Sequence, residues 1–419
     1  MVTYQALRDA DPTRWTAAAN DWVTLSQQCE QSATDIYHQG AGKVTDHWKD
    51  EVGDLAVNEL GDLANSYRVA GVTIRAVALV LEGLGESAQL AQRALQSAVD
   101  YARQCGLVID EATGKASFPD TRRRTPDEQR ELAQANHLIS QATAAATQID
   151  ETAGAELNKL GAKVDRTSLD DAFADQETAS QDQLAMFKET LPTGQSPELV
   201  RKWWDSLTDR QREEYERAVP VELYDLNGIP EDVKAELRGT DGYNAIDAIR
   251  WAQQNAHNKD IDNFSENCTN FISHAMREGG LPEKGGGFDD HDPDEWYSGT
   301  SIGSDLPDPF KIDEKTSSPS WRLADAQKQF LLGNGGRQIP PDQARPGDLV
   351  YFTQKGSGDT PIGGTHHVGL VTGVTPDGDI HYTQHNADRK DASLNGRMPD
   401  YQITTGQQEI TVVRPKRTW

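Results

Sequence analysis

Cysteine is scarce in this sequence, with only three in 419 residues: Cys29, Cys105 and Cys268. Three cysteines are too few for a disulfide framework, which excludes a small disulfide-stabilised fold. Long apolar runs are also missing, since the longest, around residues 77–84, is far shorter than the roughly 20 residues of a membrane-spanning helix. The N-terminus has no charged stretch followed by an apolar one, so we expect no Sec-type signal peptide and no membrane insertion.

Positive charge is in short supply as well. Lys and Arg number 41 against 67 Asp and Glu, which gives a net charge of −26. Nucleic-acid binding needs a concentrated positive field, so we expect no nucleic-acid partner, and an anionic membrane surface would repel the chain. Hydrophobic residues make up 36%, below the usual share for compact domains. Much of the chain should therefore be elongated or face solvent.

Residues 1–120 carry a helical pattern. Apolar residues recur at alternating steps of three and four, which places them on one stripe of a helix. The stripe consists of Leu60, Leu63, Tyr67, Ala70, Ile74, Val77 and Leu81. Gly83 and Gly85 follow it and predict a break in this helix. A long helix with one narrow apolar stripe needs a partner helix.

Residues 11–38 can supply that partner, because Trp15 and Trp22 recur there at near-helical spacing. We predict an antiparallel hairpin that turns near Trp48. It resembles the WXG-type helical hairpins of type VII secretion substrates, although Trp48 is not followed by the X-Gly of that motif. The resemblance implies export without a Sec-type signal, to the cell surface or beyond, with a secretion partner protein. An ordinary helical bundle is the alternative.

Two helical segments are expected to follow. In residues 121–190, Thr125 and Glu128 form a capping box around Pro126 and predict a linker helix. Residues 191–241 form a Trp-Trp connector that resembles the spacer before catalytic domains in secreted or surface-associated hydrolases and toxins. A pair of Trp on a short helix is usually core, so we interpret this connector as structural.

Residues 242–419 change in character. Helical patterns come first, and short strands separated by turns follow, for example residues 367–374 and 380–385 around Thr375-Pro376-Asp377-Gly378. Helices first and an antiparallel sheet afterwards indicate an α+β domain. The chain as a whole is therefore predicted to be α+β, with an all-α N-terminal half.

Cys268 is the candidate nucleophile. Ser265 is a plausible N-cap, which would place Cys268 in the first turn of a helix. The partial positive charge and free N–H groups of a helix N-terminus lower a thiol pKa and can hold an oxyanion. The alternative is a buried cysteine that acts as a small hydrophobic residue, which is what we expect of Cys29 and Cys105.

A thiol nucleophile needs a base and a group that orients the base. His367 opens an apolar strand and is the candidate base, whereas its neighbour His366 should point to the opposite face. His385 and Asn386 end the next strand, so adjacent antiparallel strands could bring either of them to His367. The spacing of residue types alone leaves the third member open.

The order Cys, His, polar residue resembles the papain-like arrangement, and residues 243–419 resemble the Putative amidase domain family, a relative of the CHAP and NlpC-type peptidases. The motifs that carry the resemblance are residues 268–273, 278–282, 345–350, 367–373 and 384–388. The resemblance implies a papain-like fold with Cys268 as nucleophile, His367 as base and His385 as the orienting residue. The pattern of CHAP-type relatives would instead place the third group at Gln384 or Asn386.

Further site residues follow from their positions. The backbone of Cys268 and the amide of Asn267 are the expected oxyanion donors. Trp296 and Trp321 could wall a substrate groove or pack in the core. The acidic residues 289–295 lack the spacing of a calcium loop, and His381 and His385 would lie too far apart along one strand for zinc, so we expect no metal and no cofactor.

These observations predict a secreted cysteine amidase or peptidase. Relatives in the wider superfamily cut peptidoglycan peptides, so a cell-wall amide is the leading substrate. Two alternatives remain: an exported toxin that acts on protein amides as a protease, deamidase or transglutaminase-like enzyme, and an inactive secreted scaffold. If the protein is such a toxin, an immunity protein is a further expected partner.

Overall fold

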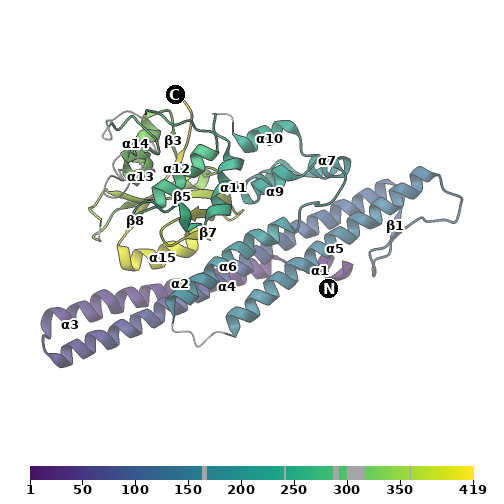
Figure 1. Ribbon diagram of the computed structural model, residues 1–419. Helices are drawn as coiled ribbons and strands as arrows, with labels where there is room; N and C mark the ends of the chain where they lie inside the picture. Colours follow the sequence, from purple (N-terminus) through teal and green to yellow (C-terminus); the bar gives the residue numbers. More distant parts are fainter. Residues whose placement is uncertain (163–167, 240–241, 286–291, 300–316, 359) are drawn as a thin grey trace. The chain divides into compact units, whose positions relative to one another are not determined.

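The computed structural model describes residues 1–162, 168–239, 242–285, 292–299, 317–358 and 360–419 (Figure 1). The chain divides into two compact units, Met1–Arg210 and Gln211–Trp419. The boundary falls inside the segment 191–241 that we expected to form a connector. Among the described residues, no helix has both the length and the apolar character needed to cross a membrane.

The first unit is almost entirely helical. Its helices are α1 (Tyr4–Asp9), α2 (Thr13–Asp35), a π-helical stretch (Ile36–Ala41), α3 (Gly42–His47), α4 (Glu51–Gln104), α5 (Pro126–Gly161), α6 (Leu169–Lys188) and α7 (Pro197–Ser206). The short strands β1 (Val108–Ile109) and β2 (Ala116–Ser117) pair between α4 and α5. The capping box at Thr125 is formed as predicted. On α7, Trp204 is buried and its ring lies 6.1 Å from that of Trp203.

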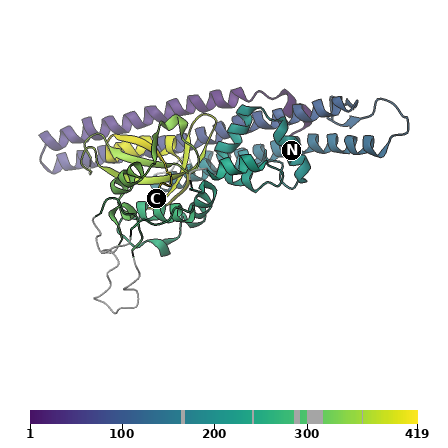
Figure 2. The ribbon, with the colours of Figure 1, turned by 90° about the horizontal axis from the view of Figure 1, so that it is seen from above.

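The helices α2 and α4 lie side by side and antiparallel, as Figures 1 and 2 show from two directions. The chain turns at residues 48–50, where the Asp50 carboxylate accepts the backbone N–H groups of Val52 and Gly53 and so starts α4. The turn near Trp48 is therefore where the sequence placed it. With 54 residues, α4 is about 80 Å long at ~1.5 Å per residue.

Gly83 and Gly85 do not break α4, contrary to our prediction. Both lie where another helix comes close. A Cβ on Gly83 would be 2.9 Å from the Gln183 Cα of α6, and one on Gly85 would be 2.6 Å from the Thr16 Cγ2 of α2. These glycines therefore serve close helix packing, and intrahelical hydrogen bonds carry α4 through both positions.

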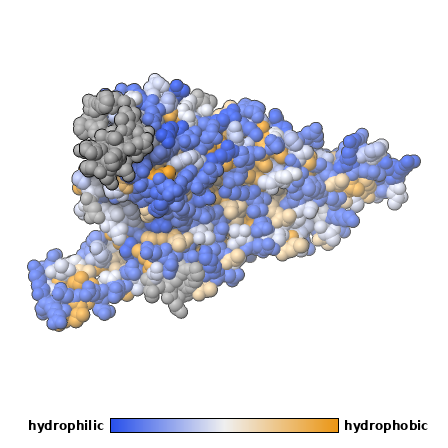
Figure 3. All heavy atoms as spheres, viewed as in Figure 1, coloured by the Kyte–Doolittle hydropathy of each residue, from blue (hydrophilic) through white to orange (hydrophobic). Residues whose placement is uncertain are grey.

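The predicted apolar stripe is not the buried face of α4. Leu63 and Tyr67 are exposed, and only Leu81 of the seven stripe residues is buried. Small residues make the close contact instead, for example Ala19 on α2 and Ala64 on α4. As a result, large apolar side chains remain exposed along the hairpin, and Figure 3 shows hydrophobic residues gathered near its turn. The exposed apolar residues along the whole hairpin are Trp22, Leu25, Tyr37, Trp48, Val52, Leu55, Leu63 and Tyr67.

The second unit is an α+β domain. Its helices are α8 (Asp209–Ala218), α9 (Pro220–Asp225), α10 (Glu231–Arg238), α11 (Ala245–Asn255), α12 (Cys268–Glu278), α13 (Pro319–Arg322), α14 (Ala324–Gly333) and α15 (Leu394–Thr405). Its strands are β3 (Arg337–Ile339), β4 (Leu349–Gln354), β5 (Thr365–Val374), β6 (Ile380–Gln384), β7 (Arg389–Ser393) and β8 (Gln408–Arg414).

These strands form one antiparallel sheet in the order β3-β8-β4-β5-β6-β7. Helices α11, α12 and α14 pack on one face, where Val368 and Leu370 of β5 join their core. The other face carries a second core around Val350 and Phe352, which α15 covers. The predicted α+β class with an antiparallel sheet is confirmed.

Candidate active site

Cys268 lies in the first turn of α12, as the sequence predicted, although the N-cap residue is Asn267 and not Ser265. Its side chain is 3% exposed and belongs to the core between α12 and the sheet. Within the part of the chain that the structure describes, the backbone N–H groups of Cys268, Thr269 and Asn270 donate to no acceptor. The thiol therefore lies beside three free N–H groups and the positive end of the helix dipole.

His367 lies on β5, opposite Phe352 of β4, and its imidazole interacts with the Cys268 thiol. Burial alone would raise the pKa of the Cys268 thiol, but the charge and hydrogen bond of His367 outweigh it and lower this pKa. The reverse holds for the imidazole. Burial would lower the pKa of His367, and the neighbouring Cys268 raises it, with a hydrogen bond to Gln384 adding to the rise. Both shifts favour a thiolate–imidazolium pair.

Gln384, at the end of β6, orients the imidazole. The His367 Nε2 lies 2.5 Å from the Gln384 Oε1, and because this oxygen can only accept, Nε2 carries the proton. The Gln384 Nε2 in turn donates to the carbonyl oxygens of Asn386 and Ala387, each at 3.2 Å. The amide therefore cannot flip without losing all three bonds. The ring nitrogen that remains for Cys268 is Nδ1.

The backbone of the β6–β7 turn makes this arrangement. Asn386 and Ala387 have φ angles of 62° and 57°, in the left-handed region that non-glycine residues rarely adopt. Two consecutive residues in this conformation turn their carbonyl oxygens back toward the end of β6, where Gln384 binds them. Such strain persists where surrounding contacts hold it, and it is common at functional sites.

The structure does not bring His385 to His367, contrary to our expectation. Side chains alternate along a strand, so Gln384 and His385 point to opposite faces of the sheet. His385 is fully buried on the face covered by α11 and α12, and its ring stacks on Phe271 at 4.3 Å. Its Nδ1 lies 2.8 Å from the Asp262 Oδ1 and its Nε2 lies 3.0 Å from the Asn255 carbonyl oxygen. Both nitrogens are occupied, so His385 fixes the loop before α12.

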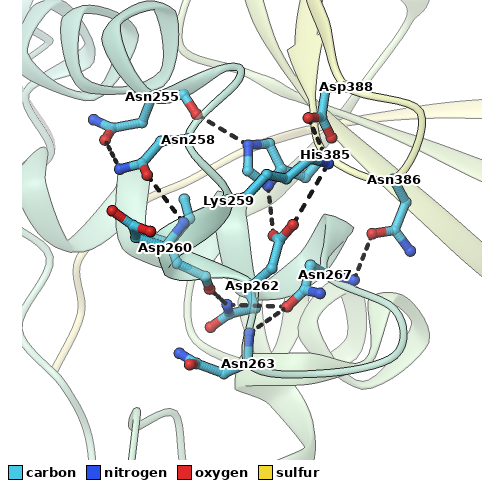
Figure 4. Close-up of polar contacts among 12 residues, drawn as sticks. Asn255, Asn258, Lys259, Asp260, Asp262, Asn263, Asn267, His385, Asn386 and Asp388 are labelled. Atoms are coloured by element: carbon cyan, nitrogen blue, oxygen red, sulfur yellow. Dashed lines mark hydrogen bonds and ion pairs between the residues drawn. The ribbon is translucent and has the colours of Figure 1, made fainter.

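That loop is held by a polar network, which Figure 4 shows. Lys259 lies 3.6 Å from the Asp262 carboxylate and 2.6 Å from the Asp388 carboxylate of the β6–β7 turn. Together with the bonds of His385, these contacts tie the segment between α11 and α12 to the strand turn. The network thus fixes the position of Cys268 relative to the turn that positions Gln384.

Asn386 belongs to the same connection and does not reach the imidazole. Its side-chain oxygen accepts the backbone N–H of Asn267 at 2.8 Å, and its amide nitrogen donates to the Glu266 carboxylate. The Asn267 side chain is also engaged, because its oxygen accepts the N–H groups of Asn263 and Phe264 at 3.1 and 3.0 Å. Its amide nitrogen donates to the Phe264 carbonyl. These bonds hold the Asn267 side chain in the loop before α12, with one of its two amide hydrogens already donated there.

Trp296 and Trp321 do not wall a groove. They are 0% and 1% exposed, and their rings lie 5.0 Å apart in the core. Each indole N–H is satisfied there, that of Trp296 by the Ser273 hydroxyl and that of Trp321 by the Asn270 side-chain oxygen. Both tryptophans therefore pack in the core, which was the second of the two expected alternatives.

His366 turns away from the thiol, as expected: its Nε2 lies 2.8 Å from the Gln408 side-chain oxygen, and its ring stacks with Tyr401. His381 is buried, with its Nδ1 3.2 Å from the Asp391 carbonyl. Across the described ranges, no three His, Cys, Asp or Glu side chains converge on one point as metal ligands would. Residues 289–291 of the acidic segment lie outside the described residues.

Comparisons with known proteins gave one family match, in the part of the chain that contains Cys268 and His367. Residues 242–407 match the model of a family described as "Putative amidase domain". The uncharacterized protein YhbB of Bacillus subtilis (strain 168) is 27% identical over 123 residues, which cover 28% of this chain and 34% of that protein. The match thus spans about a third of the curated relative's length. No solved structure matches at a significant level. The family match indicates amide hydrolysis as the general class of reaction.

Proposed function

We propose that the second unit is a cysteine-dependent amide hydrolase with Cys268, His367 and Gln384 as its catalytic group. The observation that carries this proposal is the position of His367, whose imidazole acts on the Cys268 thiol and lies in hydrogen-bond contact with Gln384, which in turn binds the turn carbonyls. Along the sequence, the nucleophile comes first, at a helix N-terminus, the base follows on one strand, and the orienting amide lies on the next strand. That order favours a papain-like arrangement.

The reaction follows from these positions. The Cys268 thiolate attacks the carbonyl carbon of the amide, and the oxygen that becomes negative is stabilised by the N–H of Cys268 and the α12 dipole. The His367 imidazolium gives its Nδ1 proton to the leaving nitrogen, which departs as an amine. His367 then takes a proton from water, the water oxygen attacks the thioester, and the acyl group leaves as a carboxylic acid.

The leading substrate is a peptide amide of peptidoglycan, as the resemblance to wall-cutting relatives implies. Protein amides are the second candidate, with the chain then acting as an exported toxin. Digestion of purified sacculi with the full chain separates the two, because only a wall hydrolase releases muropeptide fragments that mass spectrometry can identify. Hydrolysis of protein substrates without muropeptide release would favour the second.

Cysteine dependence has its own test. Cys268→Ala should abolish hydrolysis, and His367→Asn should lower it on the order of 10²- to 10⁴-fold, the usual contribution of an acid–base group. His366→Asn is the matched control, because the adjacent imidazole binds Gln408 instead of the thiol. Circular dichroism of each variant checks folding. Full activity of folded Cys268→Ala would exclude the proposed nucleophile.

The reactivity of the thiols would separate an enzyme from an inactive scaffold. The Cys268 thiol pKa is lowered, whereas burial and then the Glu30 charge raise that of Cys29. Iodoacetamide at near-neutral pH should therefore label Cys268 faster than Cys29, as peptide mapping can measure. Preferential labelling of Cys29 would point to an inert buried thiol at position 268.

A further inference from the structure

The second unit contains a pocket apart from the catalytic side chains. Its volume is about 450 Å³, within the range of small-molecule sites. The end of α10, the segment before α11, the turn before β4 and the ends of β3 and β8 line it. Asp348 in its wall lies four residues before Phe352, the strand partner of His367, and thus about 13 Å away at ~3.3 Å per residue.

The charge of the pocket opposes that of the chain. Four arginines line it, against the two carboxylates of Glu236 and Asp348, whereas the whole chain carries a net charge of −26. The four are Arg238, Arg337, Arg345 and Arg414. A concave site with an excess of guanidinium groups attracts anions and concentrates them locally.

Two of these arginines are already engaged. Arg414 binds the Asp348 carboxylate with two bonds of 2.8 Å, and Arg238 donates to the Tyr224 hydroxyl at 2.8 Å. Arg337 and Arg345 differ, because neither side chain has a hydrogen-bond or ion-pair partner among the residues placed by the structure. Glu216 is within electrostatic reach of Arg345 but forms no ion pair with it.

Tyr243 also lines the pocket. Tyr243 is 7% exposed, and its hydroxyl oxygen has no hydrogen-bond partner in the described chain. Its ring is confined, since a Cβ on Gly279 would lie 2.6 Å from the Tyr243 Cε2. Burial, then the Asp348 charge, raises the pKa of Tyr243, so the hydroxyl keeps its proton and can donate it. Buried hydroxyls are normally satisfied, so this one points to a missing acceptor.

We propose that this pocket binds the oxyanion group, carboxylate or phosphate, of a small molecule, with Arg337 and Arg345 as the charged contacts and the Tyr243 hydroxyl as the buried donor. Guanidinium groups pair with both kinds of oxyanion through two parallel hydrogen bonds. The hydroxyl adds a neutral, directional contact that fixes the anion's orientation. This proposal stands apart from the hydrolytic one, because none of its residues belongs to the catalytic group.

Calorimetric titration of the full chain with inorganic phosphate, and separately with succinate, tests the proposal at constant ionic strength. We expect one binding site per chain for at least one of the two, and the tighter of them distinguishes phosphate from carboxylate chemistry. The double variant Arg337→Gln/Arg345→Gln should weaken binding at least about tenfold. Tyr243→Phe, which removes only the hydroxyl oxygen, should weaken it roughly two- to fivefold.

Arg130→Gln is the control, because Arg130 lies on α5 of the first unit with 78% of its side chain exposed. Circular dichroism confirms that each variant is folded, and Tyr243→Phe provides a second test that leaves all four arginines in place. The proposal is overturned if neither anion binds the wild-type chain. It is equally overturned if the folded double variant and Tyr243→Phe bind as tightly as the wild type.

Discussion

The side chain that orients His367 is an uncharged amide, and this has consequences for the pH dependence of the site. A carboxylate in this place would stabilise the imidazolium by its charge, whereas Gln384 does so through one hydrogen bond. The thiolate of Cys268 is therefore the main group that keeps His367 charged. The pKa of Cys268 and the pKa of His367 each depend on the charge of the other residue, so a change at Gln384 should affect both pKa values.

We predict that Gln384→Leu lowers hydrolysis roughly 10- to 100-fold, below the effect of losing the base itself. The imidazole loses its hydrogen bond, so its pKa falls and the alkaline limb of the pH–rate profile moves to lower pH. Gln384→Glu should move the same limb to higher pH, because a carboxylate raises the pKa of His367. Iodoacetamide alkylation rates of Cys268 against pH measure both shifts. Identical profiles for all three proteins would contradict the assigned role.

A second single residue, His385, contributes to the stability of the fold. His385→Phe keeps a ring on Phe271 but removes the two ring nitrogens that contact the Asp262 carboxylate and the Asn255 carbonyl. We expect a loss of about 1–3 kcal/mol in unfolding free energy, the cost of an unsatisfied buried group, measured by urea denaturation. His257→Phe is the control on an exposed neighbour. A stability loss no larger than that of the control would mean that His385 does not hold the loop.

At the scale of elements, the α4 helix shows how packing overrides local preference. Ala is favoured over Gly in a helix interior by about 1 kcal/mol. Gly61→Ala should stabilise α4 by roughly this amount, because no atom lies within 4 Å of the added Cβ. Gly83→Ala should instead destabilise the first unit, because its Cβ would meet the backbone of α6. Thermal midpoints of the two variants should shift in opposite directions, and a shared sign would contradict the packing role.

At the scale of the whole molecule, stability depends on pH through a half-buried carboxylate, that of Glu216. Burial, then Glu236, raises the pKa of Glu216 on α8 from 4.5 to about 7. The folded state thus binds more protons than the unfolded state between these values, so this contribution to stability falls as pH rises through that window. Glu216→Gln should raise the thermal midpoint more at pH 8 than at pH 5. Glu409→Gln, an exposed carboxylate on β8, should show no such difference.

We also propose that the hairpin of α2, α3 and α4 serves export or docking. Its exposed apolar residues, including Trp22, Tyr37 and Trp48, support this, because such side chains commonly mark interaction surfaces. Deleting residues 1–110 should stop the protein leaving the producing cell and leave its specific hydrolytic activity intact. The extracellular fraction and the activity on a soluble substrate are the two readouts. Loss of that activity would mean that the hairpin contributes to the site.

Local sequence alone determined the helical first half, the helix at Cys268, the strand at His367 and the turn near Trp48, because caps, glycines and apolar periodicity act over a few residues. Tertiary structure decided the rest. Because side chains alternate along a strand, the sequence predicts that Gln384 and His385 point to opposite faces of the sheet. It does not predict which of the two faces carries α15, so only the packed sheet decides that Gln384 contacts His367. Likewise, the sequence alone predicts a helix break at Gly83 and Gly85. Their packing role becomes visible only with α6 and α2 present, because close approach involves two helices.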